Sequence, residues 1–225
     1  MELRFFEIYR SSEYLGLLAQ GVLTSAGLTI VGGILGFVLG IILAVTRFER
    51  IKGVGIIAAA YVDFIRNTPL VVQMFFVAFG LPQLLGYQWP FWAHALLALS
   101  LNFSAYFAEI FWAGLKSVDP NQSEAANALG LSRFVVLRRV LLPQAMGNMF
   151  PALSAQFVFL FLTTGIISEI SVKDLTYAGV FIDSRTFRSF EVFLTLTVLY
   201  ILISLLFKTV LSKTERVAMH WKFLR

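Results

Sequence analysis

The stretch VLTSAGLTIVGGILGFVLGIILAV, residues 22–45, decides the solvent in which this chain folds. It contains no charged side chain, and about 20 apolar residues are enough for a helix to cross the hydrocarbon core of a bilayer. The apolar residues begin near Tyr14. The whole run is too long, and begins too far from the N-terminus, for a cleavable signal peptide. We therefore predict a retained membrane-spanning helix, preceded by an interfacial segment at residues 1–20.

The rest of the chain has the same character. Of its 225 residues, 58% are hydrophobic and 14% are charged, and the mean hydropathy is +0.80. Four further windows are apolar enough to span a membrane: 54–80, 93–115, 147–168 and 191–211. These features predict an all-α polytopic membrane protein with about five transmembrane helices in one domain, residues 1–225.

The chain has no cysteine and only two histidines. Disulfides, thiolate catalysis and cysteine-ligated metals are therefore excluded, and a histidine metal site is not expected. No nucleophile and base arrangement is apparent, so an active site in this chain has little support.

Lysine and arginine are distributed unevenly between the two sides of the predicted spans. With the N-terminus outside, 12 of the 18 basic residues fall on the inner side and five on the outer side. The positive-inside rule then predicts an N-out, C-in topology with a cytoplasmic tail at residues 212–225. The net charge of +5 is explained by this orientation better than by nucleic-acid binding.

The segment SEAANALGLSRFVVLRRVLLPQA, residues 123–145, lies on the predicted cytoplasmic side. Ser123 is a good N-cap, Ala125 and Ala126 favour a helix, and Gly130 can end it or turn it. An apolar face then runs on to Pro143, so we predict two short helices joined by an elbow. From the residues alone, a docking element and a solvated connecting loop are equally good interpretations.

Polar and helix-breaking residues within the spans mark a possible solute pathway, because ionisable groups in a bilayer usually face a protein interior or a cavity. Asp63 and Arg66 are three residues apart and can pair on one helix face. The Thr68-Pro69 dipeptide interrupts the second span. The pathway candidates are Asp63, Arg66, Thr68, Pro69, Asn102, Thr163 and Thr164.

Three motifs together resemble a known family. Glu124-Ala125-Ala126, followed by Gly130 and by Val140-Leu141-Leu142-Pro143, reproduces the EAA loop of ABC importer permeases. The segments YVDFIRNTPLVVQMFFVAFGLP (61–82) and AYFAEIFWAGLKSVDPNQSEAANALG (105–130) resemble the polar amino-acid uptake branch. The resemblance covers roughly residues 15–211.

This resemblance implies that residues 123–142 form a cytoplasmic coupling helix between the third and fourth spans, docked on an ATPase subunit. The residues implied in that contact are Glu124, Ala125, Ala126, Gly130, Leu131 and Arg133. It also implies a second permease subunit, two ATPase subunits, an extracytoplasmic solute-binding protein and a bacterial inner membrane. A heterodimer of permeases is favoured over a homodimer.

The chain lacks the G-x-x-x-x-G-K-[ST] run that cradles nucleotide phosphates. No cofactor is therefore expected in this chain, and ATP and Mg are expected on the partner ATPase. The chain itself is expected to be a non-catalytic subunit.

Departures from the family pattern bear on the solute. Relatives commonly carry K-D-T-S-L where this chain has Leu162-Thr163-Thr164-Gly165-Ile166, so Thr163 replaces an acid. Relatives also tend to have arginine and glycine where Trp112 and Ala113 stand. The loss of a carboxylate disfavours a cationic amino acid. The solute is then a neutral or acidic amino acid, or this chain is the half of the pore that does not hold it, which we favour slightly.

A rival interpretation is an ion-coupled secondary carrier with Asp63 or Glu109 as the relay. Such carriers often contain internal repeats with paired broken helices. No second copy of the Thr68-Pro69 region is present, which counts weakly against a carrier.

Overall fold

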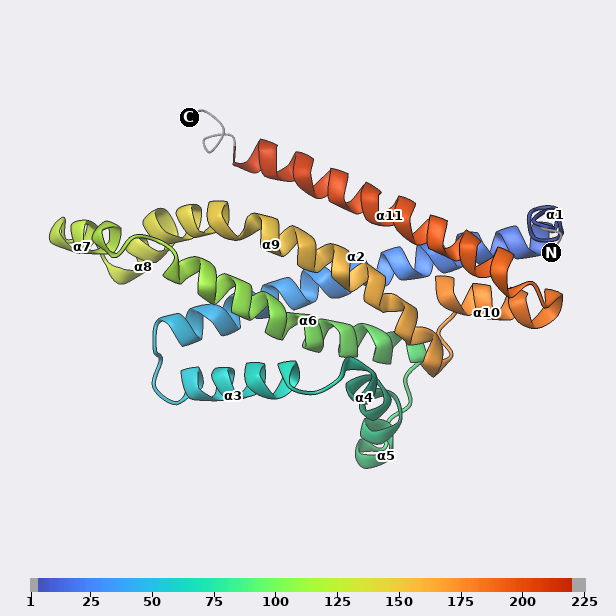
Figure 1. Ribbon diagram of the computed structural model, residues 1–225. Helices are drawn as coiled ribbons and strands as arrows, with labels where there is room; N and C mark the ends of the chain where they lie inside the picture. Colours follow the sequence, from blue (N-terminus) through green and yellow to red (C-terminus); the bar gives the residue numbers. More distant parts are fainter. Residues whose placement is uncertain (1–3, 220–225) are drawn as a thin grey trace. The chain divides into compact units, whose positions relative to one another are not determined.

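The computed structural model describes residues 4–219, and every regular element in that range is a helix (Figure 1). In chain order the elements are α1 (Phe6–Tyr9), α2 (Ser12–Phe48), α3 (Val54–Arg66), α4 (Leu70–Phe75), η1 (Phe76–Gly80), α5 (Leu81–Leu85), α6 (Phe91–Lys116), α7 (Pro120–Ala128), α8 (Arg133–Val136), η2 (Leu137–Leu141), α9 (Leu142–Thr163), η3 (Thr164–Ile170), α10 (Leu175–Thr186) and α11 (Ser189–Ala218). The prediction of an all-α membrane protein is confirmed.

Four helical stretches are long and apolar enough to cross a membrane: α2, α6, the run Arg133–Ile170, and α11. The bent pair Val54–Arg66 and Leu70–Leu85 passes the same test of length and composition when its two parts are taken together, which brings the candidate spans of the described chain to as many as five. The break contains Thr68 and Pro69, as the sequence predicted, because proline lacks a backbone donor and keeps the preceding residue out of the α conformation. The five predicted windows therefore each correspond to one of these spans, while the N-out orientation stays a prediction.

The predicted interfacial segment and tail differ from the observed helix ends. Helix α2 begins at Ser12, so the second half of the predicted 1–20 segment belongs to the first long helix. Ser11 explains this early start, because its Oγ accepts a hydrogen bond from the Tyr14 backbone N–H at 3.3 Å. Helix α11 continues to Ala218, well into the predicted tail. Residues 1–3 and 220–225 of the two predicted segments lie outside the described residues.

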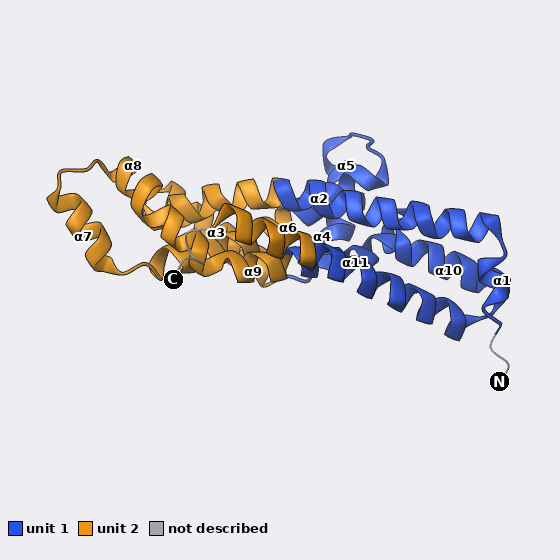
Figure 2. Ribbon diagram, turned by 90° about the horizontal axis from the view of Figure 1, so that it is seen from above, with its two compact units in different colours: residues 1–34, 68–100, 157–208 blue, residues 35–67, 101–156, 209–225 orange. Residues whose placement is uncertain are grey.

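The chain divides into two compact units (Figure 2). Unit 1 comprises residues 1–34, 68–100 and 157–208, and unit 2 comprises residues 35–67, 101–156 and 209–225. Each unit has its own buried core.

The core of unit 1 joins α1 and α2 to α10 and α11. The cluster consists of Ile8, Leu18, Leu175, Ala178, Ile182, Val192 and Leu196. Polar contacts hold the short α1 against α11: the hydroxyls of Tyr9 and Thr195 lie 2.8 Å apart, and Arg188 donates to Glu7 at 3.4 Å. The N-terminal segment is thus anchored in unit 1.

Asp174 caps α10 inside unit 1. Its Oδ1 accepts a hydrogen bond from the Tyr177 backbone N–H at 2.8 Å, and the side chain is fully buried. Within residues 4–219, its Oδ2 has no hydrogen-bond partner. Burial raises the pKa of Asp174 from 3.8 to about 6, although the backbone hydrogen bonds oppose the rise.

This pKa predicts that stability increases as the pH falls through about 6, because the folded chain binds the Asp174 proton before the unfolded chain does. Between pH 7.5 and pH 5 we expect a gain of about 1–2 kcal/mol in the free energy of unfolding. Thermal unfolding of the detergent-solubilised protein over this pH range measures the gain in stability. Asp174→Asn keeps the cap but does not titrate, so an unchanged pH dependence in this variant would exclude Asp174 as the source.

The core of unit 2 joins α2, α3 and α6. Val62, Ile65, Ala105 and Ala108 are buried together. The Tyr61 hydroxyl donates to the Leu101 carbonyl oxygen at 2.9 Å and fixes α3 along α6.

Glycines allow α2 to approach α6 closely. In unit 2, a Cβ on Gly40 would lie 2.7 Å from Phe107 Cβ and 3.1 Å from the Ser104 carbonyl oxygen. In unit 1, a Cβ on Gly32 would lie 3.7 Å from Leu99 Cβ, which is ordinary contact. The approach is tightest at Gly40.

Gly40→Ala is therefore expected to lower the free energy of unfolding by about 1–3 kcal/mol, because the added methyl meets backbone atoms that cannot rotate away. Gly27→Ala in the same helix is the matched control, since a Cβ there meets nothing within 4 Å. Thermal unfolding in detergent compares the two variants. Equal stabilities would show that α2 and α6 are not closely packed at Gly40.

Candidate functional site

The loop between the third and fourth spans begins with α7. The Asp119 side chain caps this helix by accepting a hydrogen bond from the Asn121 backbone N–H at 2.9 Å, and Pro120 occupies the first helical position. Ser123 was expected as the N-cap, and this prediction is wrong: its hydroxyl donates to the Pro120 carbonyl oxygen at 2.8 Å, inside the helix. Helix α7 thus starts four residues earlier than predicted.

The elbow lies at Gly130, where the sequence predicted it. Gly130 has a φ of 71°, in the left-handed region that side chains other than glycine rarely adopt. Two backbone hydrogen bonds close the turn: Gly130 N–H donates to Asn127 O at 2.9 Å, and Leu131 N–H donates to Ala126 O at 3.2 Å. A glycine is therefore required by the backbone rather than by neighbouring atoms, because a Cβ would meet nothing within 4 Å.

The second predicted helix does not end at Pro143. Helix α8 continues through the π-helical turn η2 into α9. The whole helical run from Arg133 to Ile170 is long and apolar enough to cross a membrane as one span. The wider turn lies directly before Pro143, whose ring and missing N–H do not fit a regular helix interior. The π turn accommodates the proline without ending the helix, which explains why the predicted end is wrong.

The loop carries an apolar surface with no cover in the described chain. Leu129 is 78% exposed and Phe134 is 67% exposed, and Leu131 is also exposed. Glu124 and Ala125 are exposed as well, whereas Ala126 is buried and anchors α7. Arg133 Nε lies 3.6 Å from Glu49 Oε2 at the end of α2, which ties the loop to unit 2. Large exposed apolar side chains beside an acid are typical of a protein-binding surface.

A charged cluster holds three helices of unit 2 together. Glu109 Oε2, on α6, lies 3.0 Å from Arg47 Nη1 on α2 and 3.3 Å from Arg66 Nη1 on α3. The Arg47 guanidinium also lies 4.9 Å from the centroid of the Trp112 ring, and Lys116 Nζ lies 3.6 Å from it. Trp112, which departs from the family pattern, thus packs against two cations.

This cluster changes the prediction for Asp63 and Arg66. Arg66 pairs with Glu109, and within residues 4–219 Asp63 forms no ion pair. The Asp63 side chain is exposed, so it is available to a partner chain or a solute. Asn102, another predicted pathway residue of unit 2, is only 3% exposed and therefore lies in the packed interior.

The remaining pathway candidates lie in unit 1. The Thr163 hydroxyl donates to the Phe159 carbonyl oxygen and the Thr164 hydroxyl to the Phe161 carbonyl oxygen, each at 2.7 Å. Thr164 is fully buried. Thr68 lies at the bend before Pro69 and contacts the Gln73 side chain amide. Both hydroxyl protons on η3 and α9 are therefore used within the helix, which leaves only their oxygen lone pairs for a ligand.

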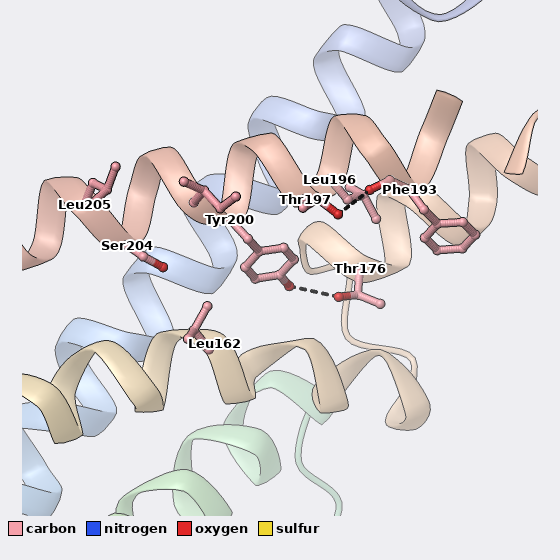
Figure 3. Close-up of a pocket in the computed structure, with 9 residues that line it drawn as sticks. Leu162, Thr176, Phe193, Leu196, Thr197, Tyr200, Ser204 and Leu205 are labelled. Atoms are coloured by element: carbon pink, nitrogen blue, oxygen red, sulfur yellow. Dashed lines mark hydrogen bonds between the residues drawn. The ribbon is translucent and has the colours of Figure 1, made fainter. Parts of the chain in front are cut away.

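Unit 1 also contains a cavity of about 530 Å³ between α9, α10 and α11 (Figure 3). The Tyr200 hydroxyl points to Thr176, with 2.8 Å between the two oxygens. The other lining residues are Leu162, Phe193, Leu196, Thr197, Ile201, Ser204 and Leu205. No charged side chain of the described residues lines it, so this cavity is poorly suited to the ammonium and carboxylate groups of an amino acid.

Sequence reasoning missed Arg47 and Trp112 as members of the charged cluster. Arg47 was counted only as a basic residue of a cytoplasmic turn, and it is 62 residues from Glu109. The available signal was weak: Glu109 is an acid within the third span, and Trp112, which departs from the family pattern, lies one turn after it.

These features define a multi-pass helical membrane protein with an exposed amphipathic loop between its third and fourth spans. The chain belongs to the family described as "Binding-protein-dependent transport system inner membrane component", which matches residues 36–215. It is therefore a transport permease subunit.

Relatives extend this likeness over most of the chain. The arginine transport system permease protein ArtQ of Bacillus subtilis (strain 168) is 34% identical over 198 residues, 88% of this chain and 90% of that protein. The L-cystine transport system permease protein TcyL of the same organism is 35% identical over 188 residues, 80% of this chain and 78% of that protein. A crystal structure of an amino acid ABC transporter with histidines has a TM-score of 0.86 and 35% identity, and the likeness covers 96% of this chain and 99% of that one.

Proposed function

We propose that this chain is the membrane subunit of an ATP-driven importer of an amino acid in a bacterial cytoplasmic membrane. It forms half of the translocation pathway with a second permease subunit, and a heterodimer is favoured. Two cytoplasmic ATPase subunits hold ATP and Mg, and an extracytoplasmic solute-binding protein delivers the solute. The chain itself is non-catalytic.

The exposed loop surface is the observation that carries this proposal. Glu124, Leu129 and Phe134 combine an acid with large apolar side chains, all exposed on a short helical elbow. A partner groove covers the apolar side chains, and a partner arginine or backbone amides bind the acid. The small side chain of Ala125 lets the partner protein approach the helix closely. We therefore assign the contact with the ATPase to Glu124, Ala125, Gly130, Leu131 and Arg133, with the buried Ala126 supporting α7 behind this surface.

An amino acid is the proposed solute class because permeases of arginine and L-cystine systems are among the relatives. Asp63 is an exposed carboxylate on α3 and is our candidate for a residue that lines the translocation pathway. Thr163 provides only a hydroxyl where an acid is common in the family. We propose that this chain is the half of a heterodimeric pore that does not hold the solute.

The rival carrier function finds no support in the relatives or in the cluster around Glu109. A proton relay must exchange its proton with water, whereas the Glu109 carboxylate is occupied by Arg47 and Arg66.

Co-purification tests the proposed assembly. The tagged chain, expressed in its native host and extracted in mild detergent, is expected to retain an ATPase subunit and a second permease that mass spectrometry identifies. Two different permease sequences would support the heterodimer, and a single one would replace it by a homodimer. An absence of any ATPase subunit, with the helical content of the chain intact, would contradict the importer assignment.

A further inference from the structure

A groove of about 490 Å³ lies in unit 2 beside the turn between α2 and α3. Its basic lining residues are Arg47, Arg50 and Lys52, and no acidic side chain of the described residues lines it. The remaining lining residues are Ile51, Gly53, Gly55, Ile56, Ala59 and Trp112. We propose that this groove binds an anionic phospholipid, with the phosphate on the basic residues and an acyl chain on the apolar wall.

The charge of the groove is only partly compensated inside the chain. Arg47 is held by Glu109 at 3.0 Å. Arg50 and Lys52 are both exposed, and neither forms an ion pair within residues 4–219. Two positive charges therefore remain for an anion, and they are fixed at a tight turn in which Arg50 has a φ of 51°.

The position of the groove favours a lipid over a soluble anion. The turn connects the end of the α2 span to the start of the α3 span, and Trp112 lies one turn before the end of the α6 span. Such span ends lie at the level of the lipid headgroups, where basic residues and tryptophan are enriched. The groove thus has its charged residues at headgroup level.

The apolar wall continues into the membrane along α3. Ile56 is 75% exposed and Ile57 is 71% exposed, on a helix that belongs to the bent span. An inorganic phosphate would leave these side chains uncovered, whereas the acyl chain of a phospholipid buries them. The combination of two uncompensated cations and an exposed isoleucine wall therefore matches a phospholipid with a net negative headgroup. This binding site is additional to the proposed transport function and does not depend on the solute.

The test uses Trp112 as a reporter inside the groove. The full-length chain, with Trp89, Trp92 and Trp221 replaced by phenylalanine, is reconstituted into nanodiscs that contain brominated phosphatidylglycerol or brominated phosphatidylcholine. Bromine quenches tryptophan fluorescence at contact, so the quenching gives the relative affinity of the two lipids. We expect phosphatidylglycerol to be favoured by about tenfold or more, since each nearby basic residue contributes about fivefold.

Arg50→Gln with Lys52→Gln is expected to reduce this preference to within about twofold. Lys208→Gln with Lys213→Gln in α11 is the matched control, because it removes two exposed positive charges elsewhere and should leave the preference unchanged. Equal quenching by both lipids, equal effects of the two double variants, or loss of the preference on addition of inorganic phosphate or glycerol phosphate would overturn the proposal. Native mass spectrometry of lipid adducts on the chain with all its tryptophans gives a second measurement if the reporter variant does not fold.

Discussion

Replacing Gly130 with valine is expected to reduce binding of the partner ATPase at least fivefold, while the spans stay folded. Gly130 has a φ of 71°, and a β-branched residue in this region costs about 1–2 kcal/mol. The backbone relieves this cost by opening the elbow, which moves Leu129 and Phe134 away from their docking positions. Affinity measured by retention of the ATPase on the immobilised chain, together with ATPase stimulation, reports the loss.

Gly86→Val is the control for this experiment. Gly86 has a φ of 70° and, like Gly130, would place a Cβ within 4 Å of nothing. The two substitutions therefore impose the same backbone strain at different places. If Gly86→Val lowers ATPase binding as much as Gly130→Val does, the effect is a general loss of stability and the elbow has no special role. Glu124→Ala, which leaves the backbone unchanged, should separately weaken binding if the acid makes a directed contact.

Replacing Glu109 with alanine is expected to lower the free energy of unfolding by about 2–3 kcal/mol. The substitution leaves Arg47 and Arg66 without their shared partner, and Arg47 is the more buried of the two, with 12% of its side chain exposed. Removal of one partner from a partly buried ion pair costs more than the pair contributes, because the remaining charge stays desolvated. We expect the unfolding temperature to fall by about 5–8 °C.

Two variants distinguish the loss of the Glu109 ion pairs from the general effect of removing an acidic side chain. Glu169→Ala removes an exposed acid in η3 and should change stability by less than about 0.5 kcal/mol. Glu109→Gln keeps the shape of the side chain and a hydrogen-bond acceptor. Its unfolding temperature should lie between those of Glu109→Ala and the wild type. An unfolding temperature of Glu109→Ala equal to that of Glu169→Ala would show that the cluster does not stabilise unit 2.

Features that are set by residues close together in the sequence were predictable from it. The spans follow from the length of apolar runs, the bend from Thr68-Pro69, and the elbow from Gly130, because each is set within a few residues. The cap of α7 was also available: Asp119 followed by Pro120 is a better helix start than Ser123. The continuity of α8 with α9 was not predictable, because a π turn before Pro143 has no simple sequence signal.

Features that depend on tertiary contacts were not predictable. Arg66 could pair with Asp63 on its own helix or with an acid elsewhere, and local spacing favoured the wrong partner. Arg66 and Glu109 meet only because α3 packs along α6, and a single sequence does not show the rotation of one helix against another. The burial of Asn102 was missed for the same reason.

Uptake by proteoliposomes distinguishes an ATP-driven importer from an ion-coupled carrier. The co-purified complex is reconstituted with ATP and Mg on the ATPase side, the solute-binding protein and a radiolabelled amino acid on the other, and ionophores that collapse every ion gradient. We expect accumulation that requires ATP, survives the ionophores and is lost in Gly130→Val. Accumulation that does not depend on ATP and disappears with the ion gradient would exclude the importer and establish a secondary carrier instead.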